Sequence, residues 1–367
     1  MPSRSPRGSR RRSGGGESSS RWASRTPRGS PGAPLERPFS VATRRPVRVG
    51  FDVSPLVQTQ AGTARHVRGV LGALQGRVDL EVLPLSYGGP GRLSTVLRDA
   101  LWYPIGISRG SERFDVLHCP TFRGPFRSRT PVVLTIHDLA VLRHPEAFRR
   151  WHRMTARAAL EGARTADAVV ALSEFTRRET IELLGVRHER VRVVPNGVEP
   201  LFTPYGDAAE GDYILAVGTL EPRKNLDRVV EAAARTGVEL RVVGARGWGG
   251  VDVPGWVGRV SDDELAALYR GAGCVVYASL YEGFGLPVLE AMASGTPVVT
   301  SAGGATEEVA GGAAVLVEPT DAEAIAAGIR EALARRDELA ARGLERARAF
   351  TWERAADELE ALWRWLA

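Results

Sequence analysis

The chain has 367 residues, of which 43% are hydrophobic and 25% are charged, a composition typical of a soluble protein long enough for two ordinary domains. Its net charge of +6 and pI near 9.8 first suggest a nucleic-acid ligand, but residues 1–48 hold twelve arginines against two glutamates, so the remainder is net acidic. These totals exclude a chain that is basic throughout, and no apolar run approaches the length of a membrane span.

The first segment, residues 1–45, is rich in Ser, Gly, Pro and Arg and lacks apolar periodicity. Such a segment cannot bury enough surface to offset the entropy of ordering, so we predict a disordered basic tail. It also lacks the apolar core of a signal peptide, and we therefore expect a cytoplasmic protein. The arginines of the tail leave open peripheral attachment to the inner face of the cell membrane, with nucleic-acid binding as the less favoured hypothesis.

From residue 46 to 197, short β-branched runs alternate with helical patterns, which indicates a parallel sheet covered by helices. Helices are expected among the strands at 62–74 and 176–186. The expected strands are 47–53, 80–86, 115–119, 131–136, 168–172 and 191–196.

The alternation restarts after a loop dense in Pro and Gly at 193–212 and predicts a second α/β domain over 198–350. Ser261 and Glu264 form a capping box at the start of one of its helices. The strands are expected at 213–218, 239–244, 274–280, 297–302 and 313–317, and the helices at 225–236, 261–272, 287–295 and 321–339. Residues 351–367 predict a last, amphipathic helix, whose apolar face needs a surface to pack against.

A Gly-containing turn follows the strand expected at 274–280, and Pro287 suits the first turn of the helix after it. The free N–H groups of Phe284, Gly285 and Leu286 would therefore point out of a helix N-terminus. Both the hydrogen-bonding groups and the helix dipole favour an anion there, and phosphate is the obvious candidate.

Two glutamates flank this turn, Glu282 before the helix and Glu290 within it. Carboxylates accept hydrogen bonds, so the pair could hold the vicinal hydroxyls of a sugar or ribose. A glutamate in an early helical turn also serves as a partner of the helix dipole, and this structural interpretation is equally open.

Lys224 is the only lysine of the chain. It follows the strand expected at 213–218, next to Arg223, so both cations would lie at the same sheet edge as the Gly-containing turn. A flexible ammonium can follow a pyrophosphate whose charge grows as a bond breaks. The alternative is an exposed pair at a helix start, but cations gain nothing from the dipole there, and this favours a functional role.

Four stretches, "VVPNGV", "VGTLEPRKNL", "VSDDELAALYRGA" and "YEGFGLPVLEAMASGTPVV", resemble the retaining nucleotide-sugar glycosyltransferases of the GT-B fold, family 4, and in particular its mannosyltransferases. The resemblance covers residues 46–367. It implies two Rossmann-like domains whose parallel sheets face across a cleft, an acceptor domain at 46–197 and a nucleotide-sugar domain at 198–350. It also implies that the helix at 351–367 crosses back to the N-terminal domain.

The resemblance further implies a role for each matching residue. Glu282 would contact the donor sugar, Glu290 the ribose hydroxyls and Lys224 the diphosphate. The family's second basic residue falls on Thr219 here, which leaves that phosphate contact open, and Arg223 is the candidate substitute.

Around the reaction centre, the resemblance makes Gly62 a backbone contact near the phosphates with His66 beside it, and Val260 a neighbour of the base. His137 would orient the transferred sugar. The implied reaction moves a hexose, with a hint toward GDP-mannose, from a nucleotide diphosphate sugar to a hydroxyl of a glycan or lipid-linked acceptor. It would retain configuration and need no metal or cofactor. A GT-B sugar-nucleotide epimerase, or a protein that binds nucleic acid or membrane through its tail, are the alternatives.

Overall fold

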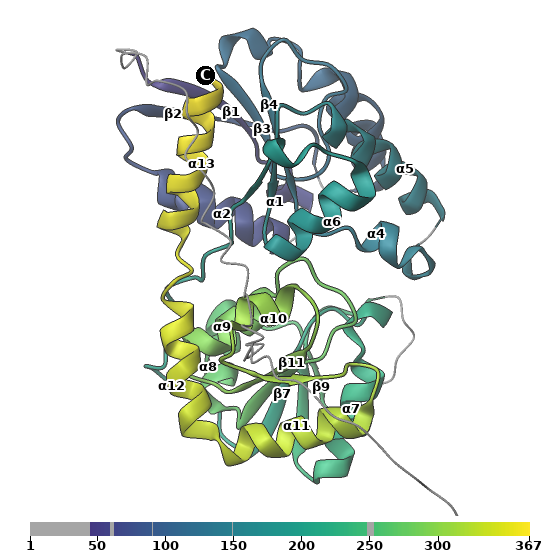
Figure 1. The fold of residues 1–367 in the computed structure, drawn as a ribbon, viewed down its shortest axis with the longest axis vertical. Helices are drawn as coiled ribbons and strands as arrows, with labels where there is room; N and C mark the ends of the chain where they lie inside the picture. The colour runs from purple at the N-terminus through teal and green to yellow at the C-terminus, as the bar shows by residue number, and fades with distance from the viewer. Residues whose placement is uncertain (1–44, 59–61, 90, 149, 248–252) are drawn as a thin grey trace, which may run out of the picture. The chain divides into compact units, whose positions relative to one another are not determined.

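Two parallel sheets organise the part of the chain that the computed structural model describes, residues 45–58, 62–89, 91–148, 150–247 and 253–367 (Figure 1). Residues 45–367 form one compact unit. The first sheet has the spatial order β2 (Leu80–Leu85), β1 (Val47–Asp52), β3 (Val116–Cys119), β4 (Val132–Ile136), β5 (Ala168–Ala171) and β6 (Val191–Val193). The second has the order β12 (Val315–Val317), β11 (Val298–Ser301), β10 (Cys274–Tyr277), β7 (Tyr213–Val217), β8 (Glu239–Val243) and β9 (Trp256–Gly258).

Helices connect the strands of both sheets. Around the first sheet lie α1 (Pro55–Gln58), α2 (Gly62–Leu74), α3 (Arg92–Leu97), α4 (Ala140–Arg143), α5 (Arg150–Glu161) and α6 (Glu174–Leu184), together with the π-helix η1 (Arg98–Gly106). Around the second lie α7 (Leu226–Thr236), α8 (Asp262–Gly271), α9 (Leu286–Ala293), α10 (Ala305–Ala310), α11 (Ala322–Ala334) and α12 (Arg336–Ala347). Short 3₁₀ turns are η2 (Ser111–Arg113), η3 (Pro145–Ala147), η4 (Gly162–Arg164), η5 (His188–Arg190) and η6 (Pro222–Lys224), and the last helix is α13 (Trp352–Leu366).

The central strands are buried along their whole length because helices cover both faces of each sheet. Every residue of β3, β4, β5, β10 and β11 is buried. This is the pattern of a parallel sheet, in which alternation between an apolar and a polar face is absent. The predicted α/β architecture with two parallel sheets is confirmed.

The last helix, α13, packs on the first sheet beside α2, as the sequence predicted (Figure 1). Leu359 and Trp363 are fully buried and Leu362 nearly so. The indole Nε1 of Trp363 donates a hydrogen bond to Nδ1 of His118 in β3, 3.1 Å away. The helix therefore completes the core of a sheet that begins about 300 residues earlier in the chain.

Local predictions were right where a single pattern decided them. The capping box of Ser261 and Glu264 starts α8, and α2 spans the predicted residues 62–74. The helix predicted at 321–339 is instead two helices, because Arg335 leaves helical geometry with φ −109° and ψ 29°. β9 was missed, since three residues between Gly and Pro signals carry no strand pattern.

The predicted tail, residues 1–45, lies outside the described residues except for Arg45, which pairs with Asp115 at 2.8 Å. The boundaries 46–197, 198–350 and 351–367 stay predictions, although the first sheet ends at Val193 and the second begins at Tyr213. Among the helices of the described residues, none combines the length and the apolar character that crossing a bilayer requires.

The contribution of α13 can be measured by Leu359→Ala. The side chain is fully buried, so its removal should lower the free energy of unfolding by about 2–5 kcal/mol, measured by urea denaturation. Leu316→Ala is the matched control, because Leu316 is 39% exposed and its loss should change the free energy of unfolding by no more than about 0.5 kcal/mol. Equal effects of the two changes would contradict the packing of α13 described here.

Candidate active site

A cleft of about 500 Å³ lies where the carboxyl ends of strands from both sheets meet. Residues that directly follow β4, β7 and β8 line it, together with Tyr277 at the end of β10, as expected for a ligand site in parallel α/β sheets. Of the twelve site residues singled out from the sequence, all except His66 line this one cleft: Gly62, His137, Thr219, Arg223, Lys224, Val260, Glu282, Phe284, Gly285, Leu286 and Glu290. The residues selected from the sequence are therefore neighbours in the structure, and their chemical roles stay predictions.

Lys224 and Arg223 enter the cleft from the tight turn η6. Asn225 ends this turn with φ 58°, a left-handed conformation that Asn adopts more easily than most residues. Its side-chain amide donates to the carbonyl oxygens of Ala278 at 2.9 Å and Pro319 at 2.6 Å. The turn is therefore fixed to neighbouring strands, and the two cations are held at the end of β7.

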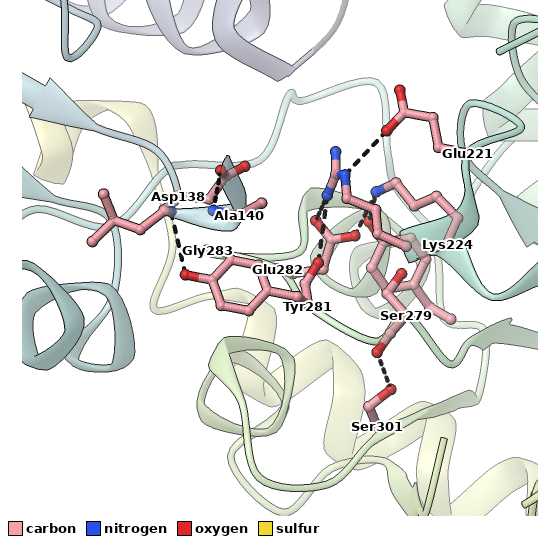
Figure 2. A network of polar contacts seen from close by, with 12 residues as sticks. Asp138, Ala140, Glu221, Lys224, Ser279, Tyr281, Glu282, Gly283 and Ser301 are labelled. Atoms are coloured by element: carbon pink, nitrogen blue, oxygen red, sulfur yellow. Dashed lines mark hydrogen bonds and ion pairs between the residues drawn. The ribbon is translucent and has the colours of Figure 1, made fainter. Parts of the chain in front are cut away.

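The carboxylate of Glu282 accepts hydrogen bonds from both cations (Figure 2). Lys224 Nζ lies 2.5 Å from Oε1 and Arg223 Nη1 lies 3.1 Å from Oε2. Burial alone would raise the pKa of Glu282, but the two cations outweigh it and lower the pKa to about 2. Glu282 is therefore ionised at neutral pH.

Each cation also has a second partner. Lys224 Nζ donates to the hydroxyl of Tyr277 at 2.6 Å, and its ammonium lies 4.9 Å from the centre of that ring. Arg223 Nε pairs with Glu221 at 3.1 Å. Burial lowers the pKa of Lys224, and the like charge of Arg223 adds to this effect, but the contact with Glu282 opposes both. Two acids and two cations therefore form one half-buried network.

The turn before α9 brings backbone groups to the same cleft. Gly285 stands at the N-cap of α9 with φ 102°, a conformation that favours glycine. The first N–H groups of a helix have no internal acceptor, so those around Leu286 are available to an anion. A Cβ built on Gly62 would lie 3.6 Å from Cδ1 of Leu286, so the two predicted phosphate-binding segments face each other closely.

Glu290 is not an unpaired carboxylate. It is buried, forms an ion pair with Arg65 of α2 and accepts a hydrogen bond from the hydroxyl of Tyr269 at 3.0 Å. Arg65 also pairs with Asp262 at the start of α8. The sequence analysis missed Arg65, although it lies within "GTARHV", because pairing across 225 residues leaves no local signal.

His137 follows β4 and lines the cleft, and one of its ring nitrogens is already hydrogen-bonded to the backbone. Its Nε2 lies 2.9 Å from the carbonyl oxygen of Pro120, and since a carbonyl only accepts, Nε2 carries the proton. Burial lowers the pKa of His137, so the ring is neutral at pH 7 and Nδ1 is an acceptor.

His66 lies behind the cleft, not on its wall. The ring is buried, its Nδ1 lies 2.8 Å from Oδ1 of Asn196, and it packs edge-on to His137 with ring centres 5.1 Å apart. His66 as a neighbour of the phosphates therefore stays a prediction. Its contacts support the orientation of the His137 ring.

The described residues contain no group of three or more His, Cys, Asp or Glu side chains that could hold a metal ion. The cleft instead carries cations of its own in Lys224, Arg223, Arg65 and Arg259.

Comparisons with known proteins agree with this geometry. The sequence matches the family Glycosyltransferase Family 4 over residues 43–200 and the family Glycosyl transferases group 1 over residues 201–350. It is 31% identical over 338 residues to the O-antigen chain mannosyltransferase B of Escherichia coli, a match that covers 83% of this chain and 85% of that one.

A second relative and a solved structure extend the comparison. The chain is 32% identical over 362 residues to the D-inositol 3-phosphate glycosyltransferase of Geodermatophilus obscurus, covering 85% of this chain and 78% of that one. Its fold is similar, with a TM-score of 0.66 and 18% identity, to that of Alr3699/HepE from Anabaena in complex with UDP and glucose, over 86% of this chain and 98% of the other. The chain therefore belongs to the group 1 glycosyltransferases of family 4 and is a glycosyltransferase of the GT-B fold.

Proposed function

We propose that the protein transfers a hexose from a nucleotide diphosphate sugar to a hydroxyl of a glycan or lipid-linked acceptor, with retention of configuration and without a metal or cofactor. The observation that carries this proposal is the pair of half-buried cations, Lys224 and Arg223, on the wall of the cleft. Such a pair suits a leaving diphosphate, whose negative charge grows as the glycosidic bond breaks.

The hydrogen-bonding capacity of the two cations supports this role. An ammonium has three N–H donors, and Lys224 commits two of them, to Tyr277 and Glu282. The Nη2 group of Arg223 makes none of the hydrogen bonds found among the described residues. Without a substrate, Glu221 and Glu282 balance the charges of the two cations. A bound diphosphate would replace Glu282 as the acceptor of their hydrogen bonds, and the Glu282 carboxylate could then bind a sugar hydroxyl.

The reaction balances with these groups alone. The acceptor oxygen forms the new bond to C1 of the sugar while the bond from C1 to the phosphate oxygen breaks, and the acceptor proton passes to a phosphate oxygen. Attack on the face that the diphosphate leaves retains the configuration. Nδ1 of His137 would accept a hydrogen bond from the sugar and orient it, and Glu290 would bind the ribose hydroxyls.

The donor and acceptor are proposed from the relatives. The name of the Escherichia coli relative, an O-antigen chain mannosyltransferase, favours a mannose donor such as GDP-mannose and a growing polysaccharide as acceptor. The Anabaena structure holds UDP, so UDP-sugars are the second donors to examine.

The proposal is tested by incubating the purified chain with a panel of GDP-, UDP- and dTDP-sugars, with and without glycan acceptors. We expect sugar transfer from one donor, an unchanged rate in excess EDTA, and an anomeric configuration in the product, read by NMR, equal to that of the donor. An inverted product would reject retention. Release of an epimerised sugar nucleotide without acceptor would reject transfer itself.

Lys224→Ala should lower turnover by about 10²–10³-fold, because it removes a cation placed where transition-state charge develops. The measurement is kcat with the donor identified above. Arg348→Ala is the control, because Arg348 is exposed and outside the cleft, and it should leave kcat unchanged. Turnover within threefold of wild type in a folded Lys224→Ala variant would remove the assignment.

Arg223→Ala tests whether this arginine replaces the missing basic residue at Thr219. We expect binding of the nucleoside diphosphate, measured by calorimetry, to weaken by about tenfold or more, as for loss of a charge-assisted hydrogen bond. Adding Thr219→Arg should restore part of the affinity, because both positions line the cleft after β7. If the affinity for the nucleoside diphosphate is unchanged in Arg223→Ala, the arginine only pairs with Glu221 and Glu282 and does not bind the diphosphate.

A further inference from the structure

The loop that carries Glu282 makes contacts with both halves of the molecule. The first half is the region of the first sheet, up to Val193, and the second half is the region of the second sheet, from Tyr213. Glu282 faces Lys224 of the second half, whereas the neighbouring Tyr281 points the other way, toward the segment of Asp138 and Ala140 in the first half (Figure 2). The Tyr281 hydroxyl accepts a hydrogen bond from the amide N–H of Leu139 at 3.2 Å.

The same hydroxyl donates to a carboxylate of α6. Tyr281 lies 2.7 Å from Oε2 of Glu179, and the other oxygen of that carboxylate accepts a bond from Nε of Arg143 at 2.8 Å. Burial and the contact with Glu179 raise the pKa of Tyr281, so the phenol keeps its proton and donates it to this bond. One hydroxyl thus joins three segments.

The start of α6 makes further contacts with the same loop. The hydroxyls of Ser173 and Thr176 donate to the carbonyl oxygen of Gly283, at 2.8 and 2.9 Å. A Cβ on Gly283 would lie 1.7 Å from the carbonyl oxygen of His137, so only glycine allows this approach. The loop therefore rests against the backbone of the residue predicted to orient the sugar.

A carboxylate of α10 also contacts the start of α6. Glu308 of α10 accepts the backbone N–H groups of Glu174 and Phe175, at 2.7 and 2.9 Å, and thereby caps the N-terminus of α6. A helix of the first half is thus capped by an acid of the second half.

We propose that Tyr281 is a positioning residue, whose hydroxyl fixes the loop of Glu282 against Leu139 and Glu179 and so aligns Glu282 with His137. Leu139 lies two residues after His137, and Tyr281 directly precedes Glu282. The hydroxyl therefore couples the contact between the two halves to the geometry of both predicted groups. This inference rests on the proposed function for its kinetic consequence but not for its structural one.

The test is Tyr281→Phe, which removes only the hydroxyl. Turnover should fall by about tenfold, the effect of losing one such hydrogen bond and leaving its partners unpaired. Affinity for UDP and GDP, measured by calorimetry, should stay within twofold, because Tyr281 does not line the cleft. Hydrogen exchange of the Leu139 amide should become faster.

Phe175→Leu is the matched control, because the Phe175 ring packs on Tyr281 with centres 5.7 Å apart but does not bond its hydroxyl. This variant should keep kcat within twofold of wild type. Glu179→Gln, which still accepts from the phenol, should retain more turnover than Glu179→Ala.

Three results would overturn the inference: wild-type turnover in Tyr281→Phe, an equal loss in Phe175→Leu, or a loss of nucleotide affinity that matches the loss of kcat. If the wild-type chain transfers no sugar from any donor, the proposed function fails and hydrogen exchange alone decides. Faster exchange at Leu139 in Tyr281→Phe, but not in Phe175→Leu, then supports the inference, and unchanged exchange rejects it.

Discussion

The contact of the half-buried Glu282 carboxylate with Lys224 and Arg223 is the interaction on which the rest of the cleft depends. A charge removed from water is costly unless it is paired and hydrogen-bonded, and here both oxygens of the carboxylate have cationic partners. The network fixes the end of β7 relative to the loop after β10. It also keeps two cations in place at the wall of the cleft.

The contacts of the ammonium at position 224 suit a lysine. The ammonium lies between the ring of Tyr277 and the carboxylate of Glu282, close to both. A compact point charge on a flexible stem suits this position, whereas a planar guanidinium needs room for its fork. In a chain that otherwise uses arginine for its basic residues, a single lysine at this place is explained by the geometry of the site.

Much of the fold could be predicted because buried parallel strands are short runs of mainly apolar residues. His137 directly follows such a run, and Lys224 and Glu282 lie in the connections that follow two others. Placing them at strand ends was enough to bring them to one edge. Contacts made by tertiary structure could not be predicted in this way. The pairing of Arg65 with Glu290, the burial of His66 behind the cleft and the two-sided bonding of Tyr281 each join segments far apart in sequence. The interruption at Arg335 was missed because the apolar period of the two helices runs on across it.

The packing of α13 on the first sheet has a consequence for biosynthesis. Val49 and Phe51 of β1 share a core with Leu359 and Trp363 of α13, which are translated about 300 residues later. One face of the first sheet therefore stays uncovered until α13 has left the ribosome. Domains of many proteins fold in order as they emerge, but this molecule cannot finish its first half before its second. During that interval the nascent chain exposes an apolar surface of the kind that chaperones bind.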